Sequence, residues 1–257
     1  MKITHVGTAT VLLEVPGYTI LTDPALDPAG RHYDFGFGLG SQKTQEPALP
    51  PGGLPPIDLV LVSHDHHADN LDLAGRAVLP GARWIVTTRT GARRLGPNAI
   101  GLDPGERVVL SPGGRSLRIT ARPAQHGPPG IALVDDLTIG FLLEWPGQAD
   151  GALYISGDTV WFGRLERALR GVKVGTAIAH LGAVGFRLTG PLRYTFTAAE
   201  AATAARTCHA RTIVPVHYDG WSHFRGTRAE TDAAFAAAGL TDKVTWLARG
   251  EPVEIAD

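Results

Sequence analysis

The chain has 257 residues, enough to bury a full hydrophobic core, and we expect residues 1–257 to form a single domain. A formal net charge of −1 and the lack of a basic block leave no electrostatic basis for binding nucleic acid. The single cysteine, Cys208, excludes an internal disulfide framework. No apolar stretch approaches the ~18 residues of a membrane span, and "MKITHVGTAT" at the N-terminus does not resemble a signal peptide, so we expect a cytoplasmic protein.

The first expected elements are two strands, residues 3–15 and 18–23, joined by a Pro-Gly turn. Residues 27–56 follow, which are rich in Gly and Pro and have no apolar period. A loop of this length in a compact domain is usually a lid, a binding loop or disordered. The loop contains three aromatic residues, Tyr33, Phe35 and Phe37. They favour a lid whose aromatic side chains point into a pocket.

The segment "IDLVLVS" (57–63) is a continuous apolar run with the length of a buried strand, and residues 69–79 have the leucine spacing of a helix. Further strands are expected at 83–88, 107–110, 116–125, 137–145, 151–157, 176–181, 211–217 and 244–248. Further helices are expected at 161–170, 198–208 and 228–238, the last two opened by Thr-x-x-Glu capping boxes. This order predicts an α/β fold, with two sheets packed face to face and helices outside, a four-layer αββα sandwich.

A cluster of metal-ligand residues lies on the turn between the expected strand 57–63 and the helix that follows. The stretch "LVSHDHHADN" (61–70) places three histidines and two aspartates in the six positions 64–69. His64 and His66 are separated by one residue, a spacing at which two imidazoles converge on one ion when the backbone turns sharply. Taken alone, such a turn is equally well a solvated loop.

Three other expected strands also end in a residue that can bind a metal ion: His126, Asp158 and His217. Sites in sheet proteins gather where loops leave the ends of strands. Four such strand ends in one chain therefore predict a metal site built from distant segments.

The motifs in this order resemble the metallo-β-lactamase superfamily: "GTATVLLEV", "ILTDPAL", "LVSHDHHADNLD", "ARPAQHGP", "YISGDT" and "VPVHYDGW". They are most similar to the branch that contains ascorbate-6-phosphate lactonase and N-acyl-phosphatidylethanolamine phospholipase D. The resemblance implies one or two Zn²⁺ ions, with Mn²⁺ or Fe²⁺ as alternatives. It implies that the first metal is held by His64, His126 and either His66 or His67. It implies that Asp69 and His217 hold the second metal, that Asp158 bridges both, and that Asp23 orients a ligand or a loop.

The chain departs from the superfamily pattern His-x-His-x-Asp-His by one inserted residue. Either His66 or His67 is the second histidine of that pattern, and the sequence does not choose between them. In both registers Asn70 stands where the pattern has its last histidine, and an amide is a far poorer zinc ligand than imidazole. We therefore expect a weakened second metal position and unequal affinities at the two positions.

A metal ion held by histidines activates water at neutral pH, which points to hydrolysis. The expected catalytic residues are Asp69, which would orient or deprotonate the water, and His223 or His180 as proton donor. Trp161, Tyr218 and Trp221 flank the ligand motifs and are candidate pocket walls for a small-molecule substrate. The favoured function is a hydrolase of a small ester, lactone or phosphodiester. The alternatives are a catalytically silent protein that binds a metal or ligand, and an iron oxygenase; the oligomeric state is left open.

Overall fold

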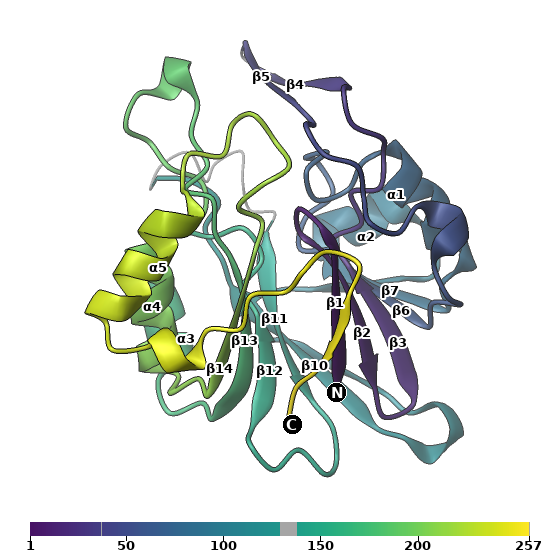
Figure 1. Ribbon diagram of the computed structural model, residues 1–257. Coiled ribbons are helices and arrows are strands. Elements are labelled where there is room, and N and C mark those ends of the chain that lie inside the picture. The colour runs from purple at the N-terminus through teal and green to yellow at the C-terminus, as the bar shows by residue number, and fades with distance from the viewer. Residues whose placement is uncertain (37, 129–137, 257) are drawn as a thin grey trace.

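The computed structural model describes residues 1–36, 38–128 and 138–256, and shows two β-sheets packed face to face between two layers of helices (Figure 1). The first sheet has the strand order β15-β1-β2-β3-β6-β7-β8. Its strands are β1 (Lys2–Gly7), β2 (Thr10–Val15), β3 (Tyr18–Thr22), β6 (Leu59–Leu61), β7 (Trp84–Thr88), β8 (Ala99–Leu102) and β15 (Pro252–Glu254). The fold is thus the αββα sandwich expected from the sequence.

The second sheet has the order β14-β13-β12-β11-β10-β9. Its strands are β9 (Arg107–Leu110), β10 (Leu117–Pro123), β11 (Ile139–Glu144), β12 (Ala152–Ile155), β13 (Val174–His180) and β14 (Thr212–Val216). β12, β13 and β14 run parallel, and β10 points the same way because β11 is antiparallel to both β10 and β12. The carboxyl ends of these four strands therefore lie at one edge, which is where open α/β sheets place their ligands.

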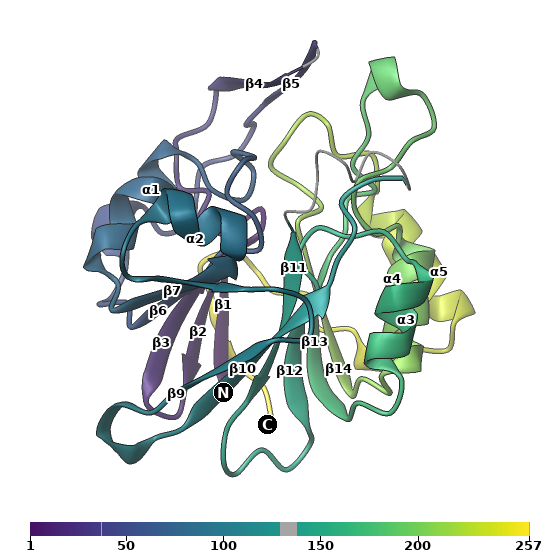
Figure 2. The same cartoon turned by 180° about the vertical axis from the view of Figure 1, so that it is seen from behind.

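Five α-helices of the described part of the chain cover the outer faces of the two sheets (Figures 1 and 2). They are α1 (Leu73–Val78), α2 (Arg89–Leu95), α3 (Gly163–Leu169), α4 (Ala198–Thr207) and α5 (Arg228–Ala237). Both expected capping boxes are present, with Thr197 and Glu200 opening α4 and Thr227 and Glu230 opening α5. Each box satisfies backbone N–H groups that the first turn of a helix leaves without partners.

The largest apolar cluster fills the space between the sheets, where side chains from both inner faces meet, among them Leu13, Ile20, Ile119, Phe141 and Val214. A second cluster lies between the second sheet and helices α3, α4 and α5, and a third lies beneath α1 and its neighbours. Burial of this apolar surface is the main term that stabilises the two sheets against each other. No described helix is long and apolar enough to cross a membrane.

Several local expectations were wrong. Residues 3–15 form two strands, because the chain turns at Thr8 with a φ of 53°. Within 27–56, β4 (His32–Gly36) and β5 (Leu39–Gln42) form a hairpin that projects beyond the sheets (Figure 1). Residues 244–248 are not a strand, since only Val244 makes a bridge, to Ile213. The sequence interpretation also missed α2, β8 and β15.

Candidate metal centre

Three imidazoles meet at the carboxyl ends of β6 and β10. His64 lies three residues after the end of β6, His67 three residues further on, and His126 three residues after the end of β10. Nδ1 of His67 lies 3.2 Å from Nε2 of His64 and 2.9 Å from Nε2 of His126. The ring nitrogens therefore face one small volume, as ligands of a single ion do. We call these three residues the first donor group.

The structure brings His67 to both His64 and His126, whereas the His66 side chain is exposed beside His64 and His67. The His66 side chain is exposed, although its ligand atom lies within 4.8 Å of those of His64 and His67. His67 takes the inner position, with Asp69 two residues later. This is one of the two registers that the sequence left open.

Burial keeps His64 and His67 of the first donor group in the neutral form that binds metal ions. Burial lowers the pKa of His64 well below its ordinary value, and nearby His66 lowers it further. Burial, with His126 beside it, lowers the pKa of His67 to about 3. A proton therefore does not compete for these two rings near pH 7.

Asp158 lies beside this group, at the end of β12. Its position depends on Gly157, which has a φ of +60° and where a Cβ would lie 2.6 Å from the Ile139 carbonyl oxygen and 3.0 Å from the Ser63 Cβ. Only glycine fits such a backbone and such a close approach. The "YISGD" segment therefore presents the Asp158 carboxylate within 4.8 Å of ligand atoms of His64 and His126.

On its other side, Asp158 faces a second set of buried side chains. Oδ1 of Asp158 lies 3.1 Å from Nδ1 of His180 and 3.5 Å from Nδ1 of His217. The ligand atoms of these three residues all lie within 4.8 Å of one another. Nε2 of His217 is in turn 3.4 Å from Oδ2 of Asp69. We call Asp69, Asp158, His180 and His217 the second donor group.

Charge is balanced within the second donor group. Burial alone would raise the pKa of Asp158, but His217 and His180 hold it below its usual range. Likewise burial opposes ionisation of Asp69, and the imidazoles of His217 and His223 hold its pKa well below the ordinary value. Burial disfavours the charged form of His217, yet the two carboxylates raise its pKa to about 9.

Several buried polar atoms of this site lack a hydrogen-bond partner in the described part of the chain: Oδ1 of Asp69, Oδ2 of Asp158, Nε2 of His180 and both ring nitrogens of His217. Leaving a buried polar group without a partner costs about 1–3 kcal/mol, so native proteins rarely keep several together without an ion or water. Neutral imidazoles and carboxylates are also the donors that zinc prefers. The residues present therefore fit one or two transition-metal ions.

Side chains behind the ligands hold the loop in place. The Ser63 hydroxyl lies 3.0 Å from Nδ1 of His64, and the Asn70 amide donates to it at 3.4 Å. The Ser63 N–H donates to Oδ1 of Asp23 at 2.6 Å, which agrees with the loop-orienting role expected for Asp23. Burial raises the pKa of Asp23 to about 8. Nδ1 of His126 donates to the carbonyl of Tyr194 at 2.8 Å, which fixes that ring.

An aromatic enclosure lies over the donor groups. His223 places Nε2 3.1 Å from Oδ2 of Asp69, and Nδ1 bonds to the Ser41 hydroxyl on the hairpin. Phe35 of the same hairpin lies 5.3 Å from His67 and 5.6 Å from His223, ring centre to ring centre. Trp221 packs 5.8 Å from His223, and its indole N–H donates to Thr8. The structure thus brings His223 and Trp221 to the site.

The other two candidate wall residues lie differently. Trp161 and Tyr218 pack, partly buried, against the apolar cluster beneath α3, α4 and α5. Tyr218 also meets Trp246 edge to face. Phe37, the third aromatic residue of the expected lid, lies outside the described residues. Sequence reasoning gave His180 only a role as proton donor, whereas the structure places it at the end of β13 with its ring stacked on that of His217.

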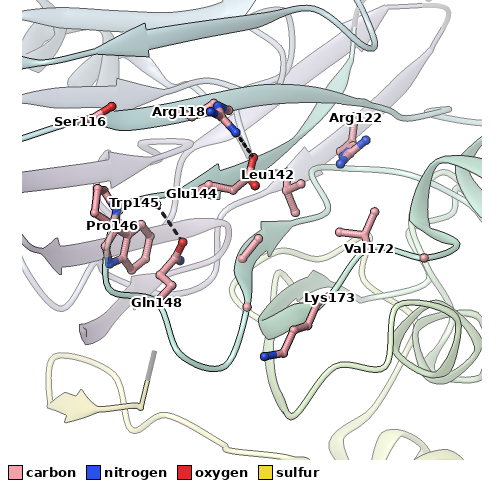
Figure 3. Close-up of a pocket in the computed structure, with 13 residues that line it drawn as sticks. Ser116, Arg118, Arg122, Leu142, Glu144, Trp145, Pro146, Gln148, Val172 and Lys173 are labelled. Carbon is pink, nitrogen blue, oxygen red and sulfur yellow. Dashed lines mark hydrogen bonds and ion pairs between the residues drawn. The ribbon is translucent and has the colours of Figure 1, made fainter.

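Two hollows differ in their relation to the donor groups. A pocket of about 180 Å³ opens beside His126 and is lined also by Gln125, Thr138 and Phe162. A larger hollow of about 630 Å³ lies where β12 and β13 begin, at the opposite ends of these strands (Figure 3). Its lining includes Arg118 and Glu144, 3.8 Å apart, and none of the metal-ligand candidates. The candidate metal site therefore lies at the carboxyl ends of the strands and not in the larger hollow.

Comparison with known proteins agrees with this geometry. The profile of the Beta-lactamase superfamily domain matches residues 18–218, so the chain belongs to the metallo-β-lactamase superfamily. A protein of Pelotomaculum thermopropionicum named UPF0173 metal-dependent hydrolase is 27% identical over 99% of this chain and 100% of its own length. The family is one of metal-dependent hydrolases, and the chain is an enzyme of this kind.

Two further comparisons show how far the similarity to known proteins extends. An uncharacterized protein of Mycobacterium bovis is 34% identical over 95 residues, which span 36% of this chain and only 24% of that relative. The crystal structure of an isothiocyanate hydrolase from Delia radicum gut bacteria superposes with a TM-score of 0.80 at 24% identity, covering 100% of this chain and 99% of that one. The structural match establishes the fold.

Proposed function

We propose that the protein hydrolyses a small substrate with an ester, lactone or phosphodiester bond, using one or two Zn²⁺ ions at the two donor groups. The observation that carries the proposal is the convergence of buried imidazole and carboxylate ligand atoms from five strand ends beneath an aromatic enclosure. Mn²⁺ and Fe²⁺ are the alternative ions. The motif similarity to the lactonase and phospholipase branch supports these substrate classes, and the sequence favours a cytoplasmic location.

The first donor group, His64, His67 and His126, would hold one ion and the second donor group the other, with Asp158 between them. A bound ion supplies activated water and polarises a carbonyl or phosphoryl oxygen. Side chains of the protein would handle the protons and contact the substrate.

We propose that Asp69 and His223 handle the protons of the reaction. Oδ2 of Asp69 contacts Nε2 of His223, so the carboxylate accepts a hydrogen bond and fixes the ring orientation. The Ser41 hydroxyl holds the other ring nitrogen. We propose that Asp69 orients the attacking water and that His223 delivers a proton to the leaving group once its Nε2 separates from Asp69.

The aromatic side chains favour a substrate with an apolar portion. Phe35, Phe186 and Trp221 surround His223, with Phe186 stacked 5.4 Å from its ring. Such surfaces exclude water and contact apolar groups through their faces. We infer that the reacting bond lies over the donor groups while the apolar portion contacts these rings.

The test uses metal-free protein reloaded with Zn²⁺, Mn²⁺ or Fe²⁺ and assayed on p-nitrophenyl esters, simple lactones and bis-p-nitrophenyl phosphate. We expect metal-dependent turnover of one class. His126→Ala should lower both bound metal and turnover, whereas His209→Ala, a change at an exposed histidine after α4, should leave both unchanged. Metal-loaded protein that turns over none of the three classes would instead support a silent binding protein, and retention of metal and activity by His126→Ala would remove that residue from the site.

A further inference from the structure

The second donor group lacks the imidazole that the superfamily pattern supplies from the position of Asn70. The Asn70 amide is buried and bonds to Ser63, which itself contacts His64. An amide is a weak ligand for zinc. Asp69, Asp158 and His217 therefore need another nitrogen donor if a second ion is to be held as tightly as in the pattern.

His180 is in place to be that donor. It is the last residue of β13, paired in register with Val216, so its ring lies next to that of His217. The two rings stack with centres 5.5 Å apart. His180 is fully buried, its Nδ1 lies 3.1 Å from Oδ1 of Asp158, and its Nε2 has no partner among the described residues. A buried imidazole with an unpaired nitrogen, grouped with the Asp158 carboxylate and the His217 ring, is arranged as a ligand.

The other nearby histidines fit this role less well. His66 and His67 group with His64 at the first position. His223 contacts Asp69 at one nitrogen and Ser41 at the other, and forms no three-residue donor group in the described part of the chain. His5 is as buried as His180 and its Nδ1 also lacks a partner, but it belongs to no three-residue donor group in the described part of the chain.

We propose that His180 is a ligand of the second metal and replaces the imidazole that Asn70 does not provide. The second ion is then held by Asp69, Asp158, His180 and His217. The inference rests on the proposed function only for the presence of metal ions, not for the substrate. Its alternative is a positioning role, in which His180 does no more than hydrogen-bond Asp158.

Two substitutions separate these roles. In His180→Asn the side-chain amide keeps a hydrogen-bond donor near the place of Nδ1, so it preserves the contact with Asp158 but removes the imidazole. In His180→Cys a thiolate, itself a strong ligand, replaces the ring. The matched controls are His5→Asn and His5→Cys, since His5 is an equally buried histidine outside the donor groups. Metal-free proteins are titrated with Zn²⁺ by calorimetry and with Co²⁺ by absorption.

We expect two ions per chain in the unmodified protein and in both His5 variants. His180→Asn should bind the second ion about 100-fold more weakly, with the first unchanged. Co²⁺-loaded His180→Cys should show a thiolate-to-cobalt charge-transfer band that His5→Cys and the unmodified protein lack.

Two ions in His180→Asn at unchanged affinity, without that band in His180→Cys, would overturn the assignment in favour of positioning. A single ion in the unmodified protein would overturn it as well. Unmodified protein that binds no metal would contradict the proposed function itself, so the two failures are distinguishable.

Discussion

The Ser63 hydroxyl contacts both His64 and Asn70, the residue that stands where the superfamily pattern has a histidine. Ser63→Ala keeps the Cβ that packs near Gly157 but removes the contact to Nδ1 of His64. Loss of such an outer contact typically weakens metal binding about 10–100-fold. Competition with a chelator should show this loss at the first position, while Ser111→Ala, at an exposed serine after β9, should bind as the unmodified protein does. Equal affinities in the two variants would contradict the role given to Ser63.

The two metal positions should also differ in their response to pH. His217 has its pKa raised to about 9, so below that pH a metal ion must displace a proton from its ring. His64 and His67 have lowered pKa values and carry no such proton near pH 7. Affinity at the second position should therefore rise about tenfold per pH unit between pH 7 and 9. The first position should stay nearly constant.

Zinc titrations at pH 7, 8 and 9 measure both slopes. His126→Ala serves as a control, because it removes a ligand of the first position and should leave the steeper dependence in place. If the affinity for the ion at the second position did not change with pH, His217 would be already neutral or would not bind that ion.

The strand-end residues were predictable because an apolar run followed by a His or Asp is a local pattern that the sequence shows directly. His64, His126, Asp158 and His217 are all marked in this way, and the structure brings them together. The choice between His66 and His67 depends on how one inserted residue bends the backbone, which no local pattern encodes. The role of His180 needed the register of β13 against β14, because only that pairing places its ring beside His217.

At the scale of elements, the β4–β5 hairpin is held by buried charges at its base. Lys43 is 2% exposed, and its ammonium donates to the Ala25 carbonyl at 2.7 Å and to Asp72 at 3.2 Å. Asp72 also caps α1 through the Gly75 N–H. At its tip, Gly38 approaches the exposed Leu188 of the facing loop. The hairpin is thus fixed at its base and meets the other half of the molecule above the site.

Phe35 is the hairpin residue expected to affect substrate binding. Phe35→Ala removes the ring that lies over His67 and His223, so we expect KM to rise about tenfold, as for the loss of an aromatic contact worth about 1–1.5 kcal/mol. Bound metal should not change. His32→Ala, an exposed position on the same strand, is the control. Unchanged KM and substrate preference would refute a lid function for residues 27–56.

Elements with strong periodicity or capping boxes were predictable, as α4 and α5 show. The hairpin was missed because its short strands pair with each other outside the two large sheets and carry little apolar alternation. Residues 244–248 have strand-like side chains, but those side chains pack on helices and apolar clusters without a pairing partner beyond Val244. Local preference was overridden there by tertiary contacts.

For the whole molecule, metal binding should appear as thermal stability. An ion that binds only the folded chain stabilises it by about 2.7 kcal/mol at a free concentration 100 times its Kd. For a chain of this size, that corresponds to about 5–10 °C in Tm. Removing metal with a chelator should lower Tm by this amount, and adding Zn²⁺ back should restore it. Calorimetry on His126→Ala should show a smaller shift; an equal shift would place the stabilising ion elsewhere.

The pairing of β15 with β1 has a consequence for synthesis on the ribosome. One edge of the strand Lys2–Gly7 is paired with residues 252–254, far later in the chain, and the amine of Met1 donates to the carbonyl of Ile255. Until these residues leave the exit tunnel, β1 presents an open edge that can pair with other chains. A nascent chain stalled after α5 would already contain every metal ligand named above, but this edge of β1 would still be unpaired. We therefore expect residues 252–254 to lower aggregation of the growing polypeptide by covering this edge of β1.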